Sequence, residues 1–431
     1  MRLALLLTTA NTALLVGVAA AAAPSTAPSF AAAKGYETGA GPESAAIADV
    51  DGDGKQDLVT GNYYGATVSV LLNGGNGVFQ RHHDYDVGTG PVSIAVSDLN
   101  GDGKADVVSA NLWTETISVL LNRVDGTFGA AVSYAAGRPY DMAVADVNGD
   151  AAPDLVFTNG EADSLSVLTN RGDGTFGSER DYETGAGPND VEVGDLNGDG
   201  RPDIATANGS ASTVSVLLNT GGGFAHSGEY DGEGGFPRLA LGDLNVDGKP
   251  DIVVVGDGGA VSLLNRGDGS FAAARLRSAW GHVLADLNGD GSPDFVTSGV
   301  WVSMNLGSGH FGPEVGYGGG RLLAVGDLNG DGRPDLVSSG EDYIDGGSVS
   351  VRLNTPGLCN VQSVNGEYFR TPTLAAAKRI LARGLCRVGK VSRVFSPYVK
   401  KGLVISQKPG FGAVLPQGGK VRLVISKGKR R

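Results

Sequence analysis

The nine residues DLNGDGRPD at 195–203 carry the pattern that decides the fold of this chain. The pattern occurs seven times, beginning at Asp49, Asp98, Asp146, Asp195, Asp243, Asp286 and Asp327. Successive copies begin 41–49 residues apart. A repeat of this length indicates an array of similar structural units, because chance does not return such a pattern seven times at a nearly constant interval.

The same kinds of segment follow each acidic copy. A short apolar run such as 58–59 comes first, and then an alternating segment at 67–72 with Val68, Val70 and Leu72 on one face. Segments with the same alternation lie at 116–121, 213–218 and 348–353. Period-two alternation rich in Val and Leu predicts a β-strand.

A Gly-rich turn then leads to a phenylalanine, usually followed six residues later by a tyrosine. The pairs are Phe79 and Tyr85, Phe128 and Tyr134, Phe176 and Tyr182, Phe224 and Tyr230, and Phe311 and Tyr317. The unit at Phe271 has Arg277 in place of the tyrosine. Each unit therefore holds about four strands, the content of one β-propeller blade.

The two ends of the array explain how it would close. The last unit stops at Asn354 without its aromatic strand, whereas an unpaired copy from Phe30 to Tyr36 lies near the N-terminus. We expect this N-terminal strand to complete the seventh blade, because ring closure removes exposed strand edges. The sequence thus predicts an all-β, seven-bladed β-propeller over residues 29–354.

On these motifs, residues 29–354 resemble the FG-GAP and VCBS repeat family. That family forms the seven-bladed propeller in the head of integrin alpha chains and in many secreted bacterial proteins. The resemblance covers the whole array and implies the same propeller here.

The acidic nonapeptides are predicted calcium sites. Calcium prefers six to eight oxygen ligands, and Gly at position 6 permits the sharp turn that brings positions 1, 3, 5 and 9 together. Position 3 is Asn in six copies and Asp51 in the first, which makes the first loop the most negative. The predicted ligands are Asp49, Asp51, Asp53, Asp57, Asp98, Asn100, Asp102, Asp106, Asp146, Asn148, Asp150, Asp154, Asp195, Asn197, Asp199, Asp203, Asp243, Asn245, Asp247, Asp251, Asp286, Asn288, Asp290, Asp294, Asp327, Asn329, Asp331 and Asp335.

Two other interpretations of these loops are an EF-hand and a simple turn. An EF-hand needs a Glu at position 12 and flanking helices, but position 12 is for example Thr60 or Phe157 and the flanks resemble strands. The residues could also simply form turns, although the fixed spacing favours calcium. The third loop has Ala151 at the Gly position and is expected to bind most weakly, while Val246 in the fifth loop is a milder departure.

The charge of the chain is divided between its two parts. The 431 residues carry a net charge of −13, but residues 357–431 hold 16 Lys and Arg against one acid, which gives +15. Residues 1–356 therefore carry −28. The acidic average argues against nucleic acid as the main partner. The basic segment could contact an anionic wall polymer, with plain solvated charge as the alternative.

Residues 357–428 form the second predicted domain, a small α+β unit. A helix is expected with Leu374, Ala377 and Leu381 on one face, ended by Gly384, and strands are expected at 403–406 and 421–426. The strings TLAAAKRILARGLCRVGKV and GLVISQKPGFGAVLPQGGKVRLVISKG resemble a PASTA domain. The resemblance implies peptidoglycan as a partner, since such domains occur in wall-sensing kinases and penicillin-binding proteins.

This second domain departs from the PASTA pattern in two places. Gln362 stands where the family has a proline, and residues 367–372 look inserted before the helix. Binding of wall fragments is therefore an open expectation.

Residues 1–23 have the layout of a secretory signal peptide. Arg2 precedes a long uncharged run that ends in small residues before Pro24; a membrane anchor is the alternative. We therefore expect a secreted, extracellular protein. The only cysteines, Cys359 and Cys386, are predicted to form a disulfide in that compartment.

No catalytic constellation is visible in the sequence. It has no G-x-S-x-G elbow, phosphate loop or HExxH, and its five histidines show no metal-ligand spacing. We expect a non-enzymatic, calcium-binding propeller that acts in binding or adhesion at the cell surface or wall, with an extracellular protein or glycan as ligand. The alternatives are a lectin-like propeller with glycan pockets between blades and a carbohydrate-active enzyme.

Overall fold

The computed structural model describes most of the chain after residue 27. The described residues are 28–123, 125–257, 259–276, 283–307, 309–340, 347–355, 358–360, 373–374, 377–378, 387–396, 399–401, 403–408, 414–416 and 420–427. The predicted signal peptide at 1–23 lies outside them and stays a prediction.

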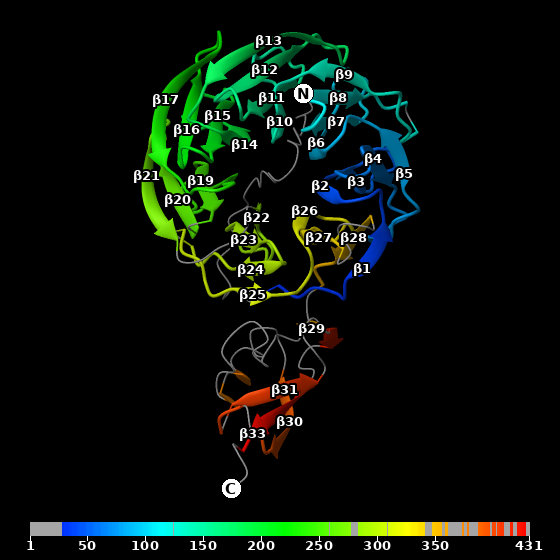
Figure 1. Cartoon of the computed structure of the whole chain (residues 1–431), viewed down its shortest axis with the longest axis vertical. Coiled ribbons are helices and arrows are strands. Elements are labelled where there is room, and N and C mark those ends of the chain that lie inside the picture. Colours follow the sequence, from blue (N-terminus) through cyan, green and yellow to red (C-terminus); the bar gives the residue numbers. More distant parts are fainter. Residues whose placement is uncertain are drawn as a thin grey trace.

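Seven four-stranded antiparallel sheets surround a common axis and form the blades of a propeller (Figure 1). Blade 1 runs outward from the axis through β2 (Pro42–Ala48), β3 (Asp57–Asn62), β4 (Thr67–Leu71) and β5 (His83–Asp86). The prediction of seven blades with about four strands each is confirmed.

Blades 2 to 6 repeat this order. Blade 2 consists of β6 (Pro91–Ser97), β7 (Asp106–Asn111), β8 (Thr116–Leu120) and β9 (Val132–Ala135), and blade 3 of β10 (Met142–Ala145), β11 (Asp154–Asn159), β12 (Ser164–Asn170) and β13 (Phe176–Glu183). Blade 4 consists of β14 (Pro188–Gly194), β15 (Asp203–Asn208), β16 (Thr213–Asn219) and β17 (Phe224–Asp231), and blade 5 of β18 (Arg238–Gly242), β19 (Asp251–Gly256), β20 (Gly259–Asn265) and β21 (Phe271–Leu276). Blade 6 consists of β22 (Val283–Ala285), β23 (Asp294–Thr297), β24 (Trp301–Ser303) and β25 (Val315–Gly316).

Blade 7 is built from both ends of the array. Its inner strands are β26 (Leu322–Gly326), β27 (Asp335–Ser339) and β28 (Ser348–Arg352), and its outer strand is the N-terminal β1 (Lys34–Glu37). The strands β1 and β28 pair antiparallel. The predicted closure of the ring by the N-terminal strand is therefore confirmed.

The core lies between the blades. All six residues of β3, and likewise of β7 and β11, are buried, whereas β5 is mostly exposed. The second strand of each blade is covered on both faces, because neighbouring blades pack face to face. This explains why those segments contain short continuous apolar runs. The third strands are buried as well, and the serines that alternate with their apolar residues, such as Ser69 and Ser118, are buried and accept a hydrogen bond from the Asn that ends the second strand.

The repeated phenylalanines and tyrosines join neighbouring blades. The tyrosine of one blade packs edge-on against the phenylalanine of the next, with ring centroids 4.8–5.4 Å apart. The pairs are Tyr36–Phe79, Tyr85–Phe128, Tyr134–Phe176, Tyr182–Phe224, Tyr230–Phe271 and Tyr317–Phe30. Where Arg277 replaces the tyrosine, Phe311 instead lies 5.7 Å from Phe295 of its own blade.

The C-terminal part contains two small sheets. In one, β33 (Lys420–Ser426) pairs parallel with β30 (Arg387–Val394) and antiparallel with β31 (Val404–Lys408). In the other, β29 (Leu358–Asn360) pairs with β32 (Val414–Pro416). The two strands predicted from the sequence here are present as β31 and β33.

Three further predictions concern this part. Leu374, Ala377 and Lys378 are helical, in agreement with the first part of the predicted helix, whereas Leu381 and Gly384 lie outside the described residues. Cys386 lies outside the described residues, so the disulfide with Cys359 stays a prediction. Within the described chain, no helix has the length and apolar character needed to cross a bilayer.

Candidate metal centres in the acidic loops

Each acidic nonapeptide joins the first and second strands of its blade, so all seven lie at one end of the propeller. The first links β2 to β3. Positions 4 and 6 require positive φ, as at Gly52 (φ 76°) and Gly54 (φ 85°), because the chain doubles back there. The sequence pattern D-x-[DN]-G-D-G therefore dictates the local fold.

The side chains at positions 1, 3 and 5 organise the loop by accepting backbone N–H groups. In the first loop, the two carboxylate oxygens of Asp49 accept from Asp53 at 3.1 Å and Gly54 at 2.8 Å. Oδ1 of Asp51 accepts from Asp53 at 3.1 Å, and Oδ1 of Asp53 accepts from Lys55 at 2.9 Å. All seven loops share the bond from the position-6 N–H to the position-1 carboxylate, at 2.7–2.9 Å.

The position-9 aspartate is buried beneath each loop. In blade 1, Asp57 accepts the Val50 N–H at 3.0 Å through Oδ2 and the Asn73 N–H at 2.6 Å through Oδ1. Burial raises the pKa of Asp57 to about 6, against the opposing effect of these two hydrogen bonds.

The same shift recurs around the ring. Burial raises the pKa of Asp106, Asp154 and Asp251 to about 6, of Asp335 to about 7 and of Asp294 to about 8, and it also raises the pKa of Asp203. A nearby cation would offset this cost of burying a negative charge.

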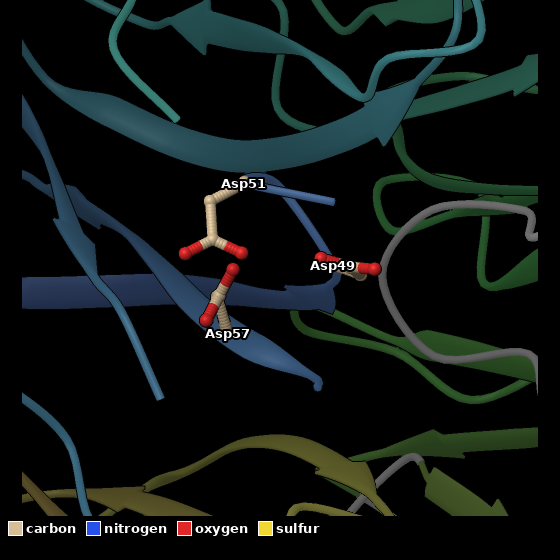
Figure 2. Close-up of side chains that lie close together, drawn as sticks. All are labelled: Asp49, Asp51 and Asp57. Carbon is tan, nitrogen blue, oxygen red and sulfur yellow. The ribbon is translucent and has the colours of Figure 1, made fainter. Parts of the chain in front are cut away.

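The first loop brings three carboxylates together. One oxygen each from Asp49, Asp51 and Asp57 lie within 4.8 Å of one another, and Figure 2 shows the three side chains gathered around the same space. Every oxygen that accepts one N–H retains a second lone pair. This set of hard oxygen donors fits a calcium ion. In the other loops position 3 supplies an amide oxygen instead.

Two loops contain a residue other than Gly where φ is positive. Ala151 at position 6 of the third loop has φ 71°, and Val246 at position 4 of the fifth loop has φ 60°. Both loops keep the shared hydrogen bond to their position-1 aspartate. A β-branched residue rarely adopts this conformation, so the backbone at Val246 is strained. This departure from the loop pattern is therefore less mild than the sequence suggests.

Sequence comparison identifies the repeats. Six overlapping stretches match the family described as FG-GAP-like repeat, at 49–109, 98–157, 146–206, 195–254, 243–297 and 286–338. The chain belongs to the FG-GAP repeat family. Residues 369–427 match the PASTA domain, as the sequence strings had suggested. Among curated proteins, none matches this chain.

Solved structures support the propeller fold of this FG-GAP protein. A lectin from Agrocybe aegerita, described as recognising non-reducing terminal N-acetylglucosamine, is 24% identical, with a TM-score of 0.51 over 73% of this chain and 86% of the lectin. BBS1N in complex with ARL6DN is 12% identical, with a TM-score of 0.55 over 77% of this chain and 98% of that one. At these identities the likeness concerns the fold alone.

The FG-GAP ring also contains an asparagine that our sequence analysis missed. Asn122 in blade 2 donates from Nδ2 to the Val50 carbonyl, at position 2 of the acidic loop of blade 1, at 2.7 Å. The equivalent pairs are Asn170–Leu99, Asn219–Val147, Asn265–Leu196, Asn305–Leu244, Asn354–Leu287 and Asn73–Leu328, all at 2.7–2.9 Å. Each acidic loop is thus bonded to the following blade.

The signal for this asparagine was present in the sequence. An Asn follows the alternating third-strand segment in every repeat, for example at Asn73 after Leu72. The alternation predicts a strand but assigns no role to the polar residue that ends it. The recurrence of this Asn in all seven units is the sequence signal, and its burial in the structure requires a hydrogen-bond partner.

Proposed function

We propose that this FG-GAP propeller is a secreted, non-enzymatic binding protein that is stiffened by calcium in its acidic loops and held at the cell wall by its PASTA domain. The observation that carries this proposal is the sevenfold recurrence of one loop geometry with oxygen donors, each loop bonded to the next blade. Calcium, when bound, supplies the positive charge that relieves repulsion between the clustered carboxylates.

The position of the loops leaves the opposite end of the propeller for a ligand. Stiffening one end fixes the spacing of the blades, and that spacing sets the geometry of any site assembled from several blades at the other end. A rigid platform of this kind suits recognition better than catalysis, because recognition needs only preorganised contacts.

The charge of the PASTA domain favours an anionic wall polymer. Residues 357–431 hold 16 Lys and Arg against the single acid Glu367. Lys400 and Lys401 are exposed and adjacent, so they are available to a polyanion. This attraction should weaken as salt concentration rises.

Sedimentation with purified cell walls tests the proposal. The full chain should sediment with walls, and the double variant Lys400→Glu with Lys401→Glu should sediment less. Lys34→Glu, an exposed reversal on the outer strand of the propeller, is the matched control and should behave as the wild type. No sedimentation of the full chain with walls would refute the wall-associating role, and wall binding unaffected by the double reversal and by salt would refute the role of the basic charge in it. Steady release of soluble product from wall polysaccharide would refute the non-enzymatic one.

A lectin-like function is the second candidate. Aromatic side chains, of which Tyr64 and Phe236 are exposed, line a cavity at the end opposite the acidic loops, and such rings are common contacts for sugars. This candidate places the glycan on the propeller rather than on the PASTA domain.

A further inference from the structure

The end of the propeller opposite the acidic loops differs from blade to blade. The turn between the second and third strands reads NYYGAT at 62–67, NLWTET at 111–116, NGEADS at 159–164 and NGSAST at 208–213. The flanking Asn and Thr or Ser recur, while the central residues change. Turns whose central residues vary while their flanking residues recur are expected where the repeats together form one asymmetric binding site.

Aromatic side chains are exposed at this end. Phe236 is 73% exposed, Trp113 is 56% exposed and Tyr64 is 54% exposed. Such a concentration of exposed rings marks a contact surface rather than a random scatter.

These rings are held in place by the chain around them. The indole Nε1 of Trp113 donates to the Tyr63 hydroxyl at 2.7 Å, and the Tyr63 and Tyr64 rings meet edge-on at 5.1 Å. Gly90 lies so close to Trp113 that a Cβ there would come within 2.4 Å of the indole. The aromatic surface is therefore preorganised.

A cavity of about 540 Å³ opens between these turns, a size typical of small-ligand sites. Its lining includes Tyr63, Tyr64, Tyr140 and Phe236, together with the charged residues Arg238 and Asp257. Tyr63, Tyr64 and Asp257 follow the second strands of blades 1 and 5, Arg238 begins β18, and Tyr140 and Phe236 lie in the segments leading into blades 3 and 5, so the cavity exists only in the closed ring. We call it the mouth cavity.

Both arginines of the mouth cavity are paired with carboxylates, and the charges of its lining are balanced. Arg238 donates to the buried carboxylate of Asp190 at 3.0 Å, and Arg321 forms an ion pair with Glu43. The lining holds two acids, Glu43 and Asp257, and two arginines. A guanidinium has five N–H donors, and the hydrogen bond from Arg238 to Asp190 uses one of them. Balanced lining charge favours a neutral ligand over a strongly charged one.

The floor below the mouth cavity offers an unused polar group. Ser93 is 2% exposed, and within the described residues its hydroxyl has no hydrogen-bond partner. It lines a polar cavity of about 30 Å³, enough for one water molecule. A buried hydroxyl without a partner is costly, so a water or ligand hydroxyl is expected there.

A sugar is the ligand that uses all of these features. The C–H faces of a pyranose pack on aromatic rings, while its hydroxyls both donate and accept hydrogen bonds. A purely apolar ligand would bury the arginines and Asp257 without new partners, at a desolvation cost. We propose that the mouth cavity is a binding site for a neutral saccharide, an inference that rests on the proposed function as a binding protein.

A glycan array tests this proposal. The full-length protein with calcium is applied to an array of neutral, amino and acidic saccharides, beside the variants Phe236→Ala and Tyr64→Ala. Leu306→Ala is the matched control, because it removes an exposed apolar side chain at the acidic-loop end. Neutral saccharides should bind, and each mouth variant should weaken binding at least about tenfold while the control does not.

Three outcomes would overturn the proposal. They are saccharide binding that survives both mouth variants, binding only to acidic saccharides, and no saccharide binding by a protein that still sediments with cell walls. In the last case the proposed function is retained and the saccharide site in the mouth cavity is rejected. If sedimentation with walls is also absent, both proposals are rejected. Melting of each variant in parallel excludes unfolding as the cause of lost binding.

Discussion

Asn170 makes the contact between blades 2 and 3 directly testable. From its buried side chain, Nδ2 donates to the Leu99 carbonyl at 2.8 Å and to the Pro153 carbonyl at 2.9 Å, and Oδ1 accepts the Gly172 N–H at 2.9 Å. The substitution Asn170→Ala removes all three bonds. At about 1 kcal/mol for each hydrogen bond, the expected loss in the free energy of unfolding is about 3 kcal/mol.

This loss converts into a shift in melting temperature. The entropy of unfolding is about 2.1 cal/mol/K per residue, or roughly 0.7 kcal/mol/K for a propeller of about 330 residues. A loss of about 3 kcal/mol then lowers the midpoint by about 4 °C. Scanning calorimetry of the full chain, with a calcium chelator present, measures this shift without a contribution from bound ion.

Asn148 supplies the matched control within the same blade. It is exposed, and its hydrogen bonds to Asp150 lie in solvent, so Asn148→Ala should lower the midpoint by less than about 1 °C. Equal shifts for the two variants would refute the reasoning. So would an unchanged midpoint for Asn170→Ala, because the bond to Leu99 would then contribute nothing to the ring.

Further predictions concern the acidic loops and the aromatic contacts. Free calcium at ten times its dissociation constant should stabilise the fold by about 1.4 kcal/mol per occupied loop, and a midpoint unchanged by chelator would exclude binding. Val246→Gly and Ala151→Gly should each raise the free energy of unfolding by about 1 kcal/mol in urea titrations with chelator, because positive φ costs Gly little; a decrease would contradict this. Burial raises the pKa of Asp294 to about 8, above its usual 3.8, so the folded state holds the extra proton, and chelated protein should lose stability as pH rises from 4 through 8. Urea midpoints at pH 5 and 8 measure that loss, which Asp294→Asn should reduce. Tyr182→Ala should lower the melting midpoint, since its ring lies 5.3 Å from Phe224 of the next blade, whereas an unchanged midpoint would make that contact neutral.

The propeller could be predicted from the sequence because its information is local and repeated. The acidic pattern fixes one loop per blade, the alternation fixes the third strand, and the split unit around Phe30 and Asn354 fixes closure. None of these steps requires knowing how one blade packs on the next. Pairing of β1 with β28 then follows from the missing strand alone.

What the sequence did not reveal depends on contacts between blades. The spacing of Phe176 and Tyr182 indicates one strand, and both lie on β13, but nothing in that spacing indicates that each ring packs on a ring of another blade. The bond from Asn170 to Leu99 spans 71 residues and exists only once the blades are stacked. The mouth cavity likewise combines Tyr64 with Phe236, which no local pattern relates.

The position-2 residue of each acidic loop connects the candidate metal site to the ring. In blade 1 the N–H of Val50 donates to the buried Asp57, and the carbonyl of Val50 accepts from Asn122 of blade 2. A cation that orders the loop therefore orders the contact with the following blade as well as its own. The last links, Asn354 to Leu287 and Asn73 to Leu328, continue the pattern through blade 7 and back to blade 1. Because the cycle is closed, each loop is connected through such asparagines to the loops of both neighbouring blades, as Asn73 and Asn122 connect the loop of blade 1 to those of blades 7 and 2. Calcium bound in the acidic loops should thus stiffen the whole ring of blades. In this way ions at one end of the propeller would keep in place the blades that form the mouth cavity at the other end.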